Sequence, residues 1–395
     1  MVVAGASLAG LRAAETLRRE GFTDRVVAVG AEPHLPYDRP PLSKQVLAGK
    51  WTPDDINLLG PNVEVDVEWR LGTRIDGLDL DGRAVRLESG ELLGFDGLVI
   101  ATGCRVRTLP VPPGVGGVHT LRTLDDCLAL KADLDAGPRR LVVVGAGFIG
   151  SEVAATARGR GVDVTLVEAL PVPLARALGE DMGRAMAEIH RDHGVDVRLG
   201  VGVDGLDVDR HGRVGRVRLS DGSSIGADVV VIGIGVRPNT EWLEGSGLRL
   251  DDGVVCDETC LAAPGVVAAG DVARWPNPTF GEVMRIEHWE NAQAQGEHAA
   301  RRLLAELDGA PGEPYAPVPW FWSDQYDRKI QLAGRAGPDD IVQVVDGSVE
   351  DGQFVALYGR AGRLVGALGM NRPRPVMEYR RMILDGVAWD DALVG

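Results

Sequence analysis

The sequence predicts an α/β protein, and the order of its apolar and glycine-rich segments is the main reason. An apolar strand, a glycine-rich turn and a helix open the chain, and the same order returns from residue 140 onward. After each helix come a second strand, short segments separated by Asp-Gly, Ser-Gly or His-Gly pairs, and a closing apolar strand. This repeat is typical of two Rossmann-like dinucleotide-binding domains, and the alternating apolar pattern near the carboxy terminus adds a small α+β domain.

The two glycine-rich turns carry the strongest signal. They read VVAGASLAG at residues 2–10 and VVVGAGFIG at residues 142–150. The first glycine of such a motif permits a tight turn, the second lets the backbone approach a pyrophosphate, and the third lets the helix pack on the strand. The helix amino terminus then directs N–H groups and a partial positive charge at the phosphates. Ser7 stands at the second glycine position of the first turn, where a small side chain still permits close approach.

An acidic residue follows the second strand of each repeat. These residues are Glu32, after strand 25–29, and Glu168, after strand 163–167. A carboxylate at this point binds the ribose hydroxyls of a dinucleotide. Two motifs with strand, helix and acid in register predict two nucleotide sites in one chain, so electrons would pass from one bound nucleotide to the other. The alternative is a pair of ordinary strand–glycine turns.

Three apolar strands set the expected domain boundaries. Strand 98–101 closes the first unit and strand 229–235 closes the second. A later strand ends in Gly270-Asp271, which places a carboxylate at the carboxyl edge of a sheet and indicates a return to the first domain. A proline-rich stretch at 311–319 precedes the last domain. The predicted division is 1–108 and 242–312 for the first dinucleotide-binding domain, 109–241 for the second, and 313–395 for the α+β domain.

The composition indicates a globular protein of a reducing compartment. Apolar residues make up 45% of the chain, and no run reaches the roughly 18 apolar residues of a membrane helix. The net charge of −16 argues against nucleic acids and anionic membranes as partners. The cysteines form neither a Cys-x-x-Cys pair nor a metal-binding spacing, which predicts reduced thiols and a cytoplasmic location. The four cysteines are Cys104, Cys127, Cys256 and Cys260.

Positive charge gathers near the carboxy terminus of this acidic chain. Between residues 360 and 381 there are six arginines and one acid, Glu378. Such a stretch would attract an acidic protein and would lose that attraction in salt. The alternative is a solvated arginine face. The arginines are Arg360, Arg363, Arg372, Arg374, Arg380 and Arg381.

The chain also resembles a known family, the NADH-dependent ferredoxin reductases that serve bacterial oxygenases. This is the putidaredoxin reductase and rubredoxin reductase group, whose wider fold is that of glutathione reductase. The resemblance runs from residue 1 to about 385, and the order of its motifs makes it specific. The motifs are PYDRPPLSK at 36–44, ATG at 101–103, LRT at 121–123, GAGFIGSE at 145–152, GVRPN at 235–239, AGD at 269–271 and PWFWSDQ at 319–325.

The resemblance implies that the first site holds FAD and the second holds NADH. The residues implied to bind FAD are Gly5, Ser7, Ala9, Gly10, Glu32, Arg39, Lys44, Ala101, Thr102, Gly103, Arg122, Gly270, Asp271, Trp289 and Trp322. The residues implied to line the NADH site are Gly145, Gly147, Phe148, Ile149, Gly150, Glu152, Glu168 and Gly235. The implied catalytic residues are Lys44, nearest the flavin ring, its partner Glu152, and Trp322.

The residues themselves leave alternatives open for some of these roles. Glu152 would sit in the first turn of the second helix, where a carboxylate favourably opposes the helix dipole. Trp322 and its neighbour Trp320 could equally pack in the core of the small domain. Glu168 favours NADH over NADPH, because like charges at about 4 Å cost roughly 4 kcal/mol per pair at an effective dielectric near 20. Arg176 could soften that penalty.

The position of the cysteines bears on the reaction. Disulfide reductases of this fold carry a redox-active cysteine pair soon after the first acidic strand end, whereas residues 39–44 here read RPPLSK. Electrons would therefore leave the flavin singly, toward a [2Fe–2S] ferredoxin or rubredoxin that serves a cytochrome P450 or a dioxygenase. We expect a monomer or weak homodimer. The alternatives are an NADH oxidase or small-oxidant reductase, and an FAD-binding interaction protein without catalysis.

Overall fold

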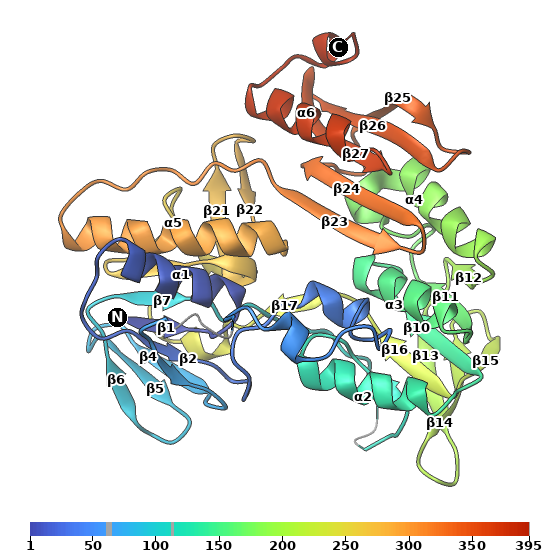
Figure 1. Ribbon diagram of the computed structural model, residues 1–395, viewed down its shortest axis with the longest axis horizontal. Helices are drawn as coiled ribbons and strands as arrows, with labels where there is room; N and C mark the ends of the chain where they lie inside the picture. Colours follow the sequence, from blue (N-terminus) through green and yellow to red (C-terminus); the bar gives the residue numbers. More distant parts are fainter. Residues whose placement is uncertain (61–64, 112–113, 395) are drawn as a thin grey trace. The chain divides into compact units, whose positions relative to one another are not determined.

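The computed structural model describes residues 1–60, 65–111 and 114–394 (Figure 1). Within these ranges the chain forms two compact units, each assembled from three segments. Unit 1 consists of Met1–Asp38, Asn57–Arg105 and Arg237–Phe321. Unit 2 consists of Arg39–Ile56, Val106–Val236 and Trp322–Gly395. No helix in the described ranges combines the length and the apolar character that crossing a bilayer requires.

Unit 1 is built on a six-stranded sheet with the order β19-β20-β7-β1-β2-β3. Its neighbouring strands are parallel, except that β19 runs antiparallel to β20. The strands β1, β2, β7 and β20 are buried, as expected of parallel strands that are covered on both faces. The strands are β1 (Val2–Ala4), β2 (Val27–Val29), β3 (Glu68–Arg70), β7 (Leu98–Ile100), β19 (Leu261–Ala263) and β20 (Val266–Ala268).

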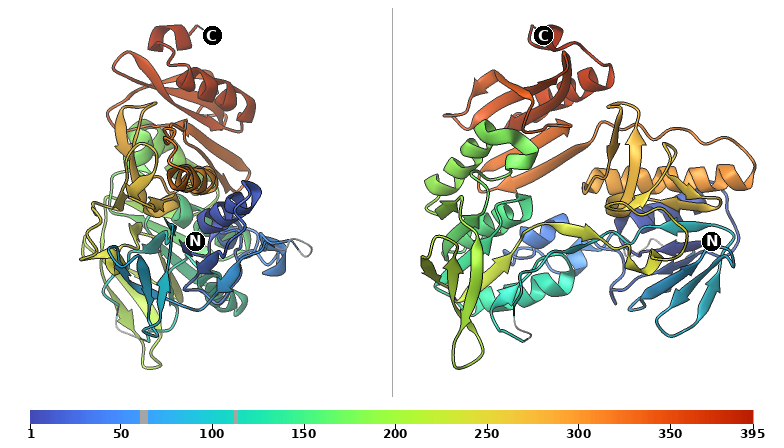
Figure 2. Two further views of the ribbon diagram at one scale, coloured as in Figure 1. Left: turned by 90° about the vertical axis from the view of Figure 1, so that its left-hand side faces the viewer. Right: turned by 180° about the vertical axis from the view of Figure 1, so that it is seen from behind.

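Two helices of unit 1 lie side by side (Figures 1 and 2). They are α1 (Leu8–Arg19) and α5 (Trp289–Leu307). A Cβ atom at Gly296 of α5 would lie 2.4 Å from the carbonyl oxygen of Ala9 in α1, so glycine is needed for this close approach. Helix α5 thereby brings its amino-terminal turns to the helix that follows the first glycine motif.

Smaller sheets complete unit 1. One is the meander β4-β5-β6, and another has the order β18-β21-β22. Their bounds are β4 (Ile75–Asp79), β5 (Ala84–Leu87), β6 (Leu92–Gly94), β18 (Val254–Val255), β21 (Ala273–Asn277) and β22 (Glu282–Met284). Single turns of 3-10 helix occur at η3 (Glu241–Leu243) and η4 (Gly270–Val272). Trp275 is fully buried among these elements.

Unit 2 repeats the plan around a five-stranded parallel sheet with the order β12-β11-β10-β16-β9. A three-stranded meander, β13-β14-β15, accompanies it. The strands are β9 (Val118–His119), β10 (Arg140–Val144), β11 (Asp163–Glu168), β12 (Asp196–Leu199), β13 (Val203–Val208), β14 (Val214–Leu219), β15 (Ser224–Gly226) and β16 (Val229–Ile232). Strands β8 (Cys104–Val106) and β17 (Val236–Pro238) pair with each other.

The helices of unit 2 begin and end at identifiable residues. Thr123 and Asp126 form a capping box at the start of α2, where each side chain accepts a hydrogen bond from the backbone of the other residue. Gly179, with φ of 76°, interrupts the regular geometry of α4. The helices are η1 (Pro40–Ser43), η2 (Asp54–Ile56), α2 (Leu124–Asp135), α3 (Phe148–Gly159) and α4 (Ala175–Asp192).

The carboxy-terminal part of unit 2 is a five-stranded sheet, β23-β24-β27-β26-β25, with α6 packed on β24 and β27 (Figure 1). The strands are β23 (Trp320–Gln325), β24 (Arg328–Gly334), β25 (Ile341–Ser348), β26 (Gln353–Arg360) and β27 (Arg363–Met370). The helices are α6 (Pro373–Leu384) and α7 (Trp389–Ala392). Phe354 and Tyr358 of β26 are fully buried.

The predicted fold class is confirmed: a mostly parallel sheet in unit 1 and a parallel sheet in unit 2 each carry a glycine turn, and a small α+β region ends the chain. The Asp-Gly and Ser-Gly pairs join β4 to β5 and β5 to β6. Segment 39–56, which the predicted division assigns to the first domain, belongs to unit 2, and so do strands β24–β27. Segment 39–56 folds with unit 2 because Ser43 and Lys44 form hydrogen bonds with residues of α3.

Candidate active site

The first glycine turn connects β1 to α1 in unit 1. Gly5 has φ of +123°, and a Cβ atom there would lie 2.1 Å from the carbonyl oxygen of Ala101. A Cβ atom at Gly10 would lie 1.9 Å from the carbonyl oxygen of Gly5. The first α-helical hydrogen bond runs from the Leu11 N–H to the Ser7 carbonyl, so the preceding amides point out of the helix end. This turn has the shape and the donors that a pyrophosphate requires.

Two carboxylates follow β2 within the same unit. The Tyr37 hydroxyl donates to Oε2 of Glu32 at 2.5 Å. The indole Nε1 of Trp289, the first residue of α5, donates to Oδ1 of Asp38 at 2.7 Å. Glu32 is therefore held at the end of the strand where a ribose would lie. Trp289 and Asp38 fix the start of α5 to the segment after β2.

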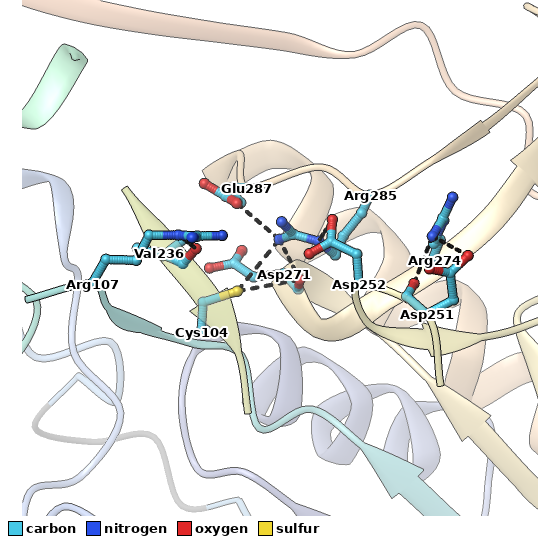
Figure 3. A network of polar contacts seen from close by, with 9 residues as sticks. All are labelled: Cys104, Arg107, Val236, Asp251, Asp252, Asp271, Arg274, Arg285 and Glu287. Atoms are coloured by element: carbon cyan, nitrogen blue, oxygen red, sulfur yellow. Dashed lines mark hydrogen bonds and ion pairs between the residues drawn. The ribbon is translucent and has the colours of Figure 1, made fainter. Parts of the chain in front are cut away.

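Asp271 lies on the short helix η4, and the turn is held from two sides. The Gly270 N–H donates to Oε1 of Gln295 at 2.9 Å. Arg285 Nη1 donates to the main-chain oxygen of Asp271 at 3.1 Å, and Cys104 Sγ donates to that oxygen at 3.4 Å (Figure 3). These bonds fix the backbone of the Gly270–Asp271 turn at the edge of the sheet.

Arg285 and Gln295 are functional candidates that the sequence reasoning missed. Arg285 is also bonded to Glu287 at 2.8 Å and to Asp252 at 3.2 Å (Figure 3). Burial acts to lower the pKa of Arg285, but the nearby Glu287 carboxylate and Cys104 outweigh it and raise the pKa above its ordinary value. The sequence offers one signal for Gln295: it follows the polar Asn291 by four residues, which places both side chains on one face of a helix. In the structure both side chains are buried.

The second glycine turn, in unit 2, repeats the geometry of the first. Gly145 has φ of +99°, and a Cβ atom there would lie 2.3 Å from the carbonyl oxygen of Gly233. A Cβ atom at Gly150 would lie 2.0 Å from the carbonyl oxygen of Gly145. In contrast, a Cβ atom at Gly147, directly before α3, would meet no described atom within 4 Å. The open side at Gly147 is where a ligand's phosphates would approach the backbone.

Glu168 ends β11 and is oriented by the backbone around it. Its Oε2 accepts from the Ala146 N–H at 2.8 Å, and its Oε1 accepts from the Leu170 N–H at 2.9 Å. The carboxylate therefore stands beside the second glycine turn in one orientation. Ile149, in the first turn of α3, is 47% exposed, which leaves its side chain available to a ligand. Gly235 has φ of +96° and lies after β16.

A buried cluster joins segment 39–56 to α3. Lys44 Nζ and Glu152 Oε2 form an ion pair at 2.7 Å, which is the pairing that the resemblance implied. Ser43 Oγ donates to the same Oε2 at 2.5 Å, and Ser323 Oγ donates to Oε1 at 2.7 Å. Thr156 Oγ1 donates to the Ser43 carbonyl at 2.7 Å. These bonds explain why segment 39–56 folds with unit 2.

The other predicted FAD residues are divided between the units. Arg39, Lys44, Arg122 and Trp322 belong to unit 2, and Arg39 Nη1 donates to the Arg122 carbonyl at 2.5 Å. The remaining predicted FAD residues belong to unit 1. Trp322 is half-buried on β23, beside Ser323.

All four cysteines are buried free thiols. Burial raises the pKa of Cys127 and of Cys256 to about 12, and it raises the pKa of Cys260 as well. Thiols of this kind stay protonated near neutral pH, and the thiolate is the reactive form. Among the described residues, no cluster of histidine, cysteine, aspartate or glutamate has the arrangement of a metal site.

Family models match nearly the whole chain. Residues 1–296 match the pyridine nucleotide-disulphide oxidoreductase family, and residues 320–395 match the reductase C-terminal family. Rhodocoxin reductase of Rhodococcus erythropolis is 41% identical over 97% of this chain and 89% of its own length. Putidaredoxin reductase of Pseudomonas putida is 35% identical over 100% of this chain and 94% of its own length.

Two further matches agree. The ferredoxin–NAD(+) reductase component of the anthranilate 1,2-dioxygenase system of Burkholderia cepacia is 39% identical over 98% of this chain and 95% of its own length. The crystal structure of the covalent putidaredoxin reductase–putidaredoxin complex matches with a TM-score of 0.92 and 34% identity, covering 98% of this chain and 93% of that one. The chain therefore belongs to the pyridine nucleotide-disulphide oxidoreductase family, as one of its members with a reductase C-terminal domain and the sequence of a ferredoxin–NAD⁺ reductase.

Proposed function

We propose that the protein is an FAD-dependent NADH:ferredoxin oxidoreductase. It passes electrons one at a time from NADH through FAD to a [2Fe–2S] ferredoxin or rubredoxin that serves an oxygenase such as a cytochrome P450 or a dioxygenase. The observation that carries the proposal is the pair of glycine turns with matching geometry, Gly5 to Gly10 and Gly145 to Gly150, in one chain. The segment after the first acidic strand end, residues 39–44, contains no cysteine and supplies Lys44, which pairs with Glu152.

The FAD pyrophosphate would lie on the first glycine turn. Gly5, Ser7, Ala9 and Gly10 form its floor, and Glu32 binds the adenosine ribose. The remaining FAD contacts are assigned to Arg39, Lys44, Ala101, Thr102, Gly103, Arg122, Gly270, Asp271, Trp289 and Trp322. Two observations support this assignment. The N–H groups at the start of α1 are available as donors, and the close backbone approaches at Gly5 and Gly10 are possible only because glycine has no Cβ atom. When bound, FAD would supply the chemistry that accepts the two electrons of one hydride and releases them one at a time.

NADH would lie on the second glycine turn. Gly145, Gly147 and Gly150 shape the phosphate site. Phe148, Ile149, Glu152 and Gly235 line the nicotinamide side. Both oxygens of Glu168 accept backbone N–H bonds, so the carboxylate cannot turn away from a ribose. A 2′-phosphate would face that fixed negative charge, which supports NADH over NADPH.

Lys44 would supply a fixed positive charge close to the flavin ring. A lysine ammonium is a compact charge on a flexible side chain, so its position varies unless a partner binds it. Here the Glu152 carboxylate binds it at 2.7 Å. A charge that is already in position stabilises negative charge as it develops, without reorganisation. We therefore assign Lys44, Glu152 and Trp322 as the catalytic residues.

The proposed partner surface is the exposed face of α6. Arg360 is bonded to Asp340 at 2.6 Å, and Arg372 is bonded to Asp346 at 3.1 Å, so these two charges are partly neutralised. Arg374 and Arg381 are exposed and stand seven residues apart on α6, on one helix face. We assign this face of α6 as the part of the arginine-rich stretch that would steer an acidic ferredoxin.

The protein would act in the cytoplasm as a monomer or weak homodimer. A reducing compartment suits four buried free thiols. The reductase activity is tested by mixing the FAD-loaded protein with NADH and following cytochrome c reduction across a panel of [2Fe–2S] ferredoxins. We expect rapid bleaching of the flavin absorbance and reduction that depends on the carrier. Oxygen consumption at the same rate without any carrier would instead identify an NADH oxidase.

A further inference from the structure

Glu152 is a buried carboxylate whose two oxygens are bound by different segments. Its Oε2 accepts from Ser43 and Lys44, which belong to segment 39–56. Its Oε1 accepts from Ser323 of β23 at 2.7 Å, and within the described ranges Ser323 is the side chain bonded to that atom. The Glu152 side chain is 4% exposed. A charge buried to this degree persists only when it is paired and hydrogen-bonded.

The hydrogen bonds around Ser323 run in one direction. Gln325 Nε2 donates to Ser323 Oγ at 3.2 Å, and Ser323 in turn donates to Glu152. Ser323 and Gln325 are two residues apart on β23, so they point to the same face of the strand, and both are buried. A serine hydroxyl has one proton. Gln325 Nε2 donates to Ser323 Oγ, and an ionised carboxylate can only accept, so the Ser323 proton is the one shared with Glu152.

We propose that Ser323 is a positioning residue that sets the orientation of the Glu152 carboxylate and thereby fixes Lys44. Without the bond to Oε1, the carboxylate is held only through Oε2, by Ser43 and Lys44. Oε1 can then move, and the direction of Oε2 toward Lys44 is less firmly set. The same bond ties β23, which carries Trp322, to Glu152 in the second turn of α3. This inference deepens the proposed function, because it concerns the residues assigned to catalysis.

Four variants separate this role from general damage. Ser323→Ala removes the donor without adding bulk, whereas Ser323→Thr keeps a hydroxyl. Glu152→Gln removes the charge itself and serves as the positive control. Tyr358→Phe is the matched control, because the Tyr358 hydroxyl is also buried, also comes from the carboxy-terminal sheet, and donates at 3.0 Å to the Leu178 carbonyl of α4. Within the described ranges Tyr358 forms no hydrogen bond with Glu152, and it is not assigned to catalysis.

The measurement is site-resolved acylation of lysine in the FAD-loaded protein. The chain has only four lysines, Lys44, Lys50, Lys131 and Lys329, so acetic anhydride labelling followed by peptide mass spectrometry reports each one. We expect Ser323→Ala to raise the labelling rate of Lys44 about fivefold, the factor that corresponds to one net hydrogen bond. Ser323→Thr and Tyr358→Phe should leave Lys44 as protected as in the parent protein, and the other three lysines should not change in any variant.

The proposal is overturned if Ser323→Ala leaves Lys44 protected while Glu152→Gln exposes it. If Ser323→Ala does not fold, Ser323→Cys provides the test, since a thiol keeps the volume but donates only weakly. Parent-like protection of Lys44 in that variant would overturn the proposal as well. Labelling requires no electron transfer. A protein with a protected Lys44 but no carrier-dependent reduction would therefore refute the proposed function and leave the role of Ser323 standing.

Discussion

The indole of Trp289 donates a hydrogen bond to the Asp38 carboxylate at 2.7 Å and so ties the start of α5 to the segment after β2. Both residues belong to unit 1, the unit that holds the first glycine turn. Trp289 is also one of the residues proposed to border the flavin. The bond therefore connects a residue that would touch the cofactor to the strand end that carries Glu32.

Replacing Trp289 by phenylalanine tests this connection. The ring keeps most of its apolar area but loses the donor, which is worth about 1.5–3 kcal/mol when the acceptor is charged. We expect the FAD dissociation constant to rise by roughly tenfold or more. Titration of the apoprotein with FAD, followed by flavin fluorescence, measures it. Trp51→Phe, at an exposed position, should not change FAD affinity, and an equal effect of both variants would count against the assignment.

The second glycine turn predicts opposite outcomes for two neighbouring glycines. Gly150→Ala would place a Cβ atom 2.0 Å from the Gly145 carbonyl oxygen, so we expect a loss of at least 1–3 kcal/mol in the free energy of unfolding. Gly147→Ala meets open space and should fold with an unchanged melting temperature. It should nevertheless raise the KM for NADH about tenfold, because the methyl group fills the phosphate site. A Gly147→Ala protein with parent-like KM would exclude this turn as the NADH site.

Glu168 should determine the choice between NADH and NADPH. Glu168→Gln keeps an acceptor for the Ala146 N–H but removes the charge that repels a 2′-phosphate. We expect kcat/KM for NADPH to rise about tenfold to a hundredfold, in the direction set by Coulomb repulsion. Asp163→Asn, at the exposed start of the same strand, is the control and should leave the preference unchanged. Steady-state assays with NADH and NADPH measure kcat/KM for each nucleotide. An unchanged preference in Glu168→Gln would contradict the prediction.

His190 should make the stability of unit 2 depend on pH. Burial, and secondarily the charge of His193, lowers the pKa of His190 from 6.5 to about 4. The unfolded chain therefore binds this proton at a higher pH than the folded one. The stability contributed by neutral His190 is present above about pH 6.5 and is lost between pH 6.5 and 4, by about 1.4 kcal/mol per pH unit.

Urea unfolding at pH 5 and pH 7.5 measures this dependence. His190→Gln should flatten it, since glutamine does not titrate, even though the bond to the Tyr326 hydroxyl at 3.0 Å is altered. His211→Gln, at an exposed position, should retain the slope of the parent protein. Identical slopes for the parent and His190→Gln would show that another group controls acid sensitivity.

The arginines of α6 should affect association rather than chemistry. Neutralising Arg374 and Arg381 to glutamine should slow ferredoxin-dependent cytochrome c reduction about tenfold at low ionic strength, because steering by surface charge acts on the encounter rate. The salt dependence should flatten accordingly, while flavin reduction by NADH stays unchanged. Arg216→Gln, an exposed arginine on β14, is the matched control. A steep salt dependence that survives the double substitution would place the docking surface elsewhere.

Some features of the site could be predicted because the information is local. Each glycine turn lies within nine residues, and its spacing is readable from that stretch alone. The atoms that a Cβ atom would meet at Gly5 and Gly145 are the carbonyl oxygens of Ala101 and Gly233, which come much later in the chain. The acid after the second strand follows from the same short repeat. The family, the fold class and the cofactors were predictable for this reason, and the family matches confirm them.

Other features depend on residues far apart in the chain. Ser323 and Glu152 are 171 positions apart, and no spacing rule connects them. Arg285 and Gln295 hold the Asp271 turn from two directions. The spacing of Asn291 and Gln295 indicates a polar face on α5, but no pattern in the sequence connects that face or Arg285 to Asp271. The charge of Arg372 is partly neutralised by Asp346, an acid outside the arginine-rich stretch.

The sequence by itself determined where the chain turns tightly, which strand ends carry acids and which residue types are available near each turn. These properties depend on backbone sterics and on the alternation of neighbouring residues. Only the tertiary structure decided which hydroxyl groups bind Glu152, which acids neutralise the arginines, and with which unit segment 39–56 folds. The physical reason is that a hydrogen bond or an ion pair depends on distances of about 3 Å between side chains, and those distances exist only after distant segments have packed together.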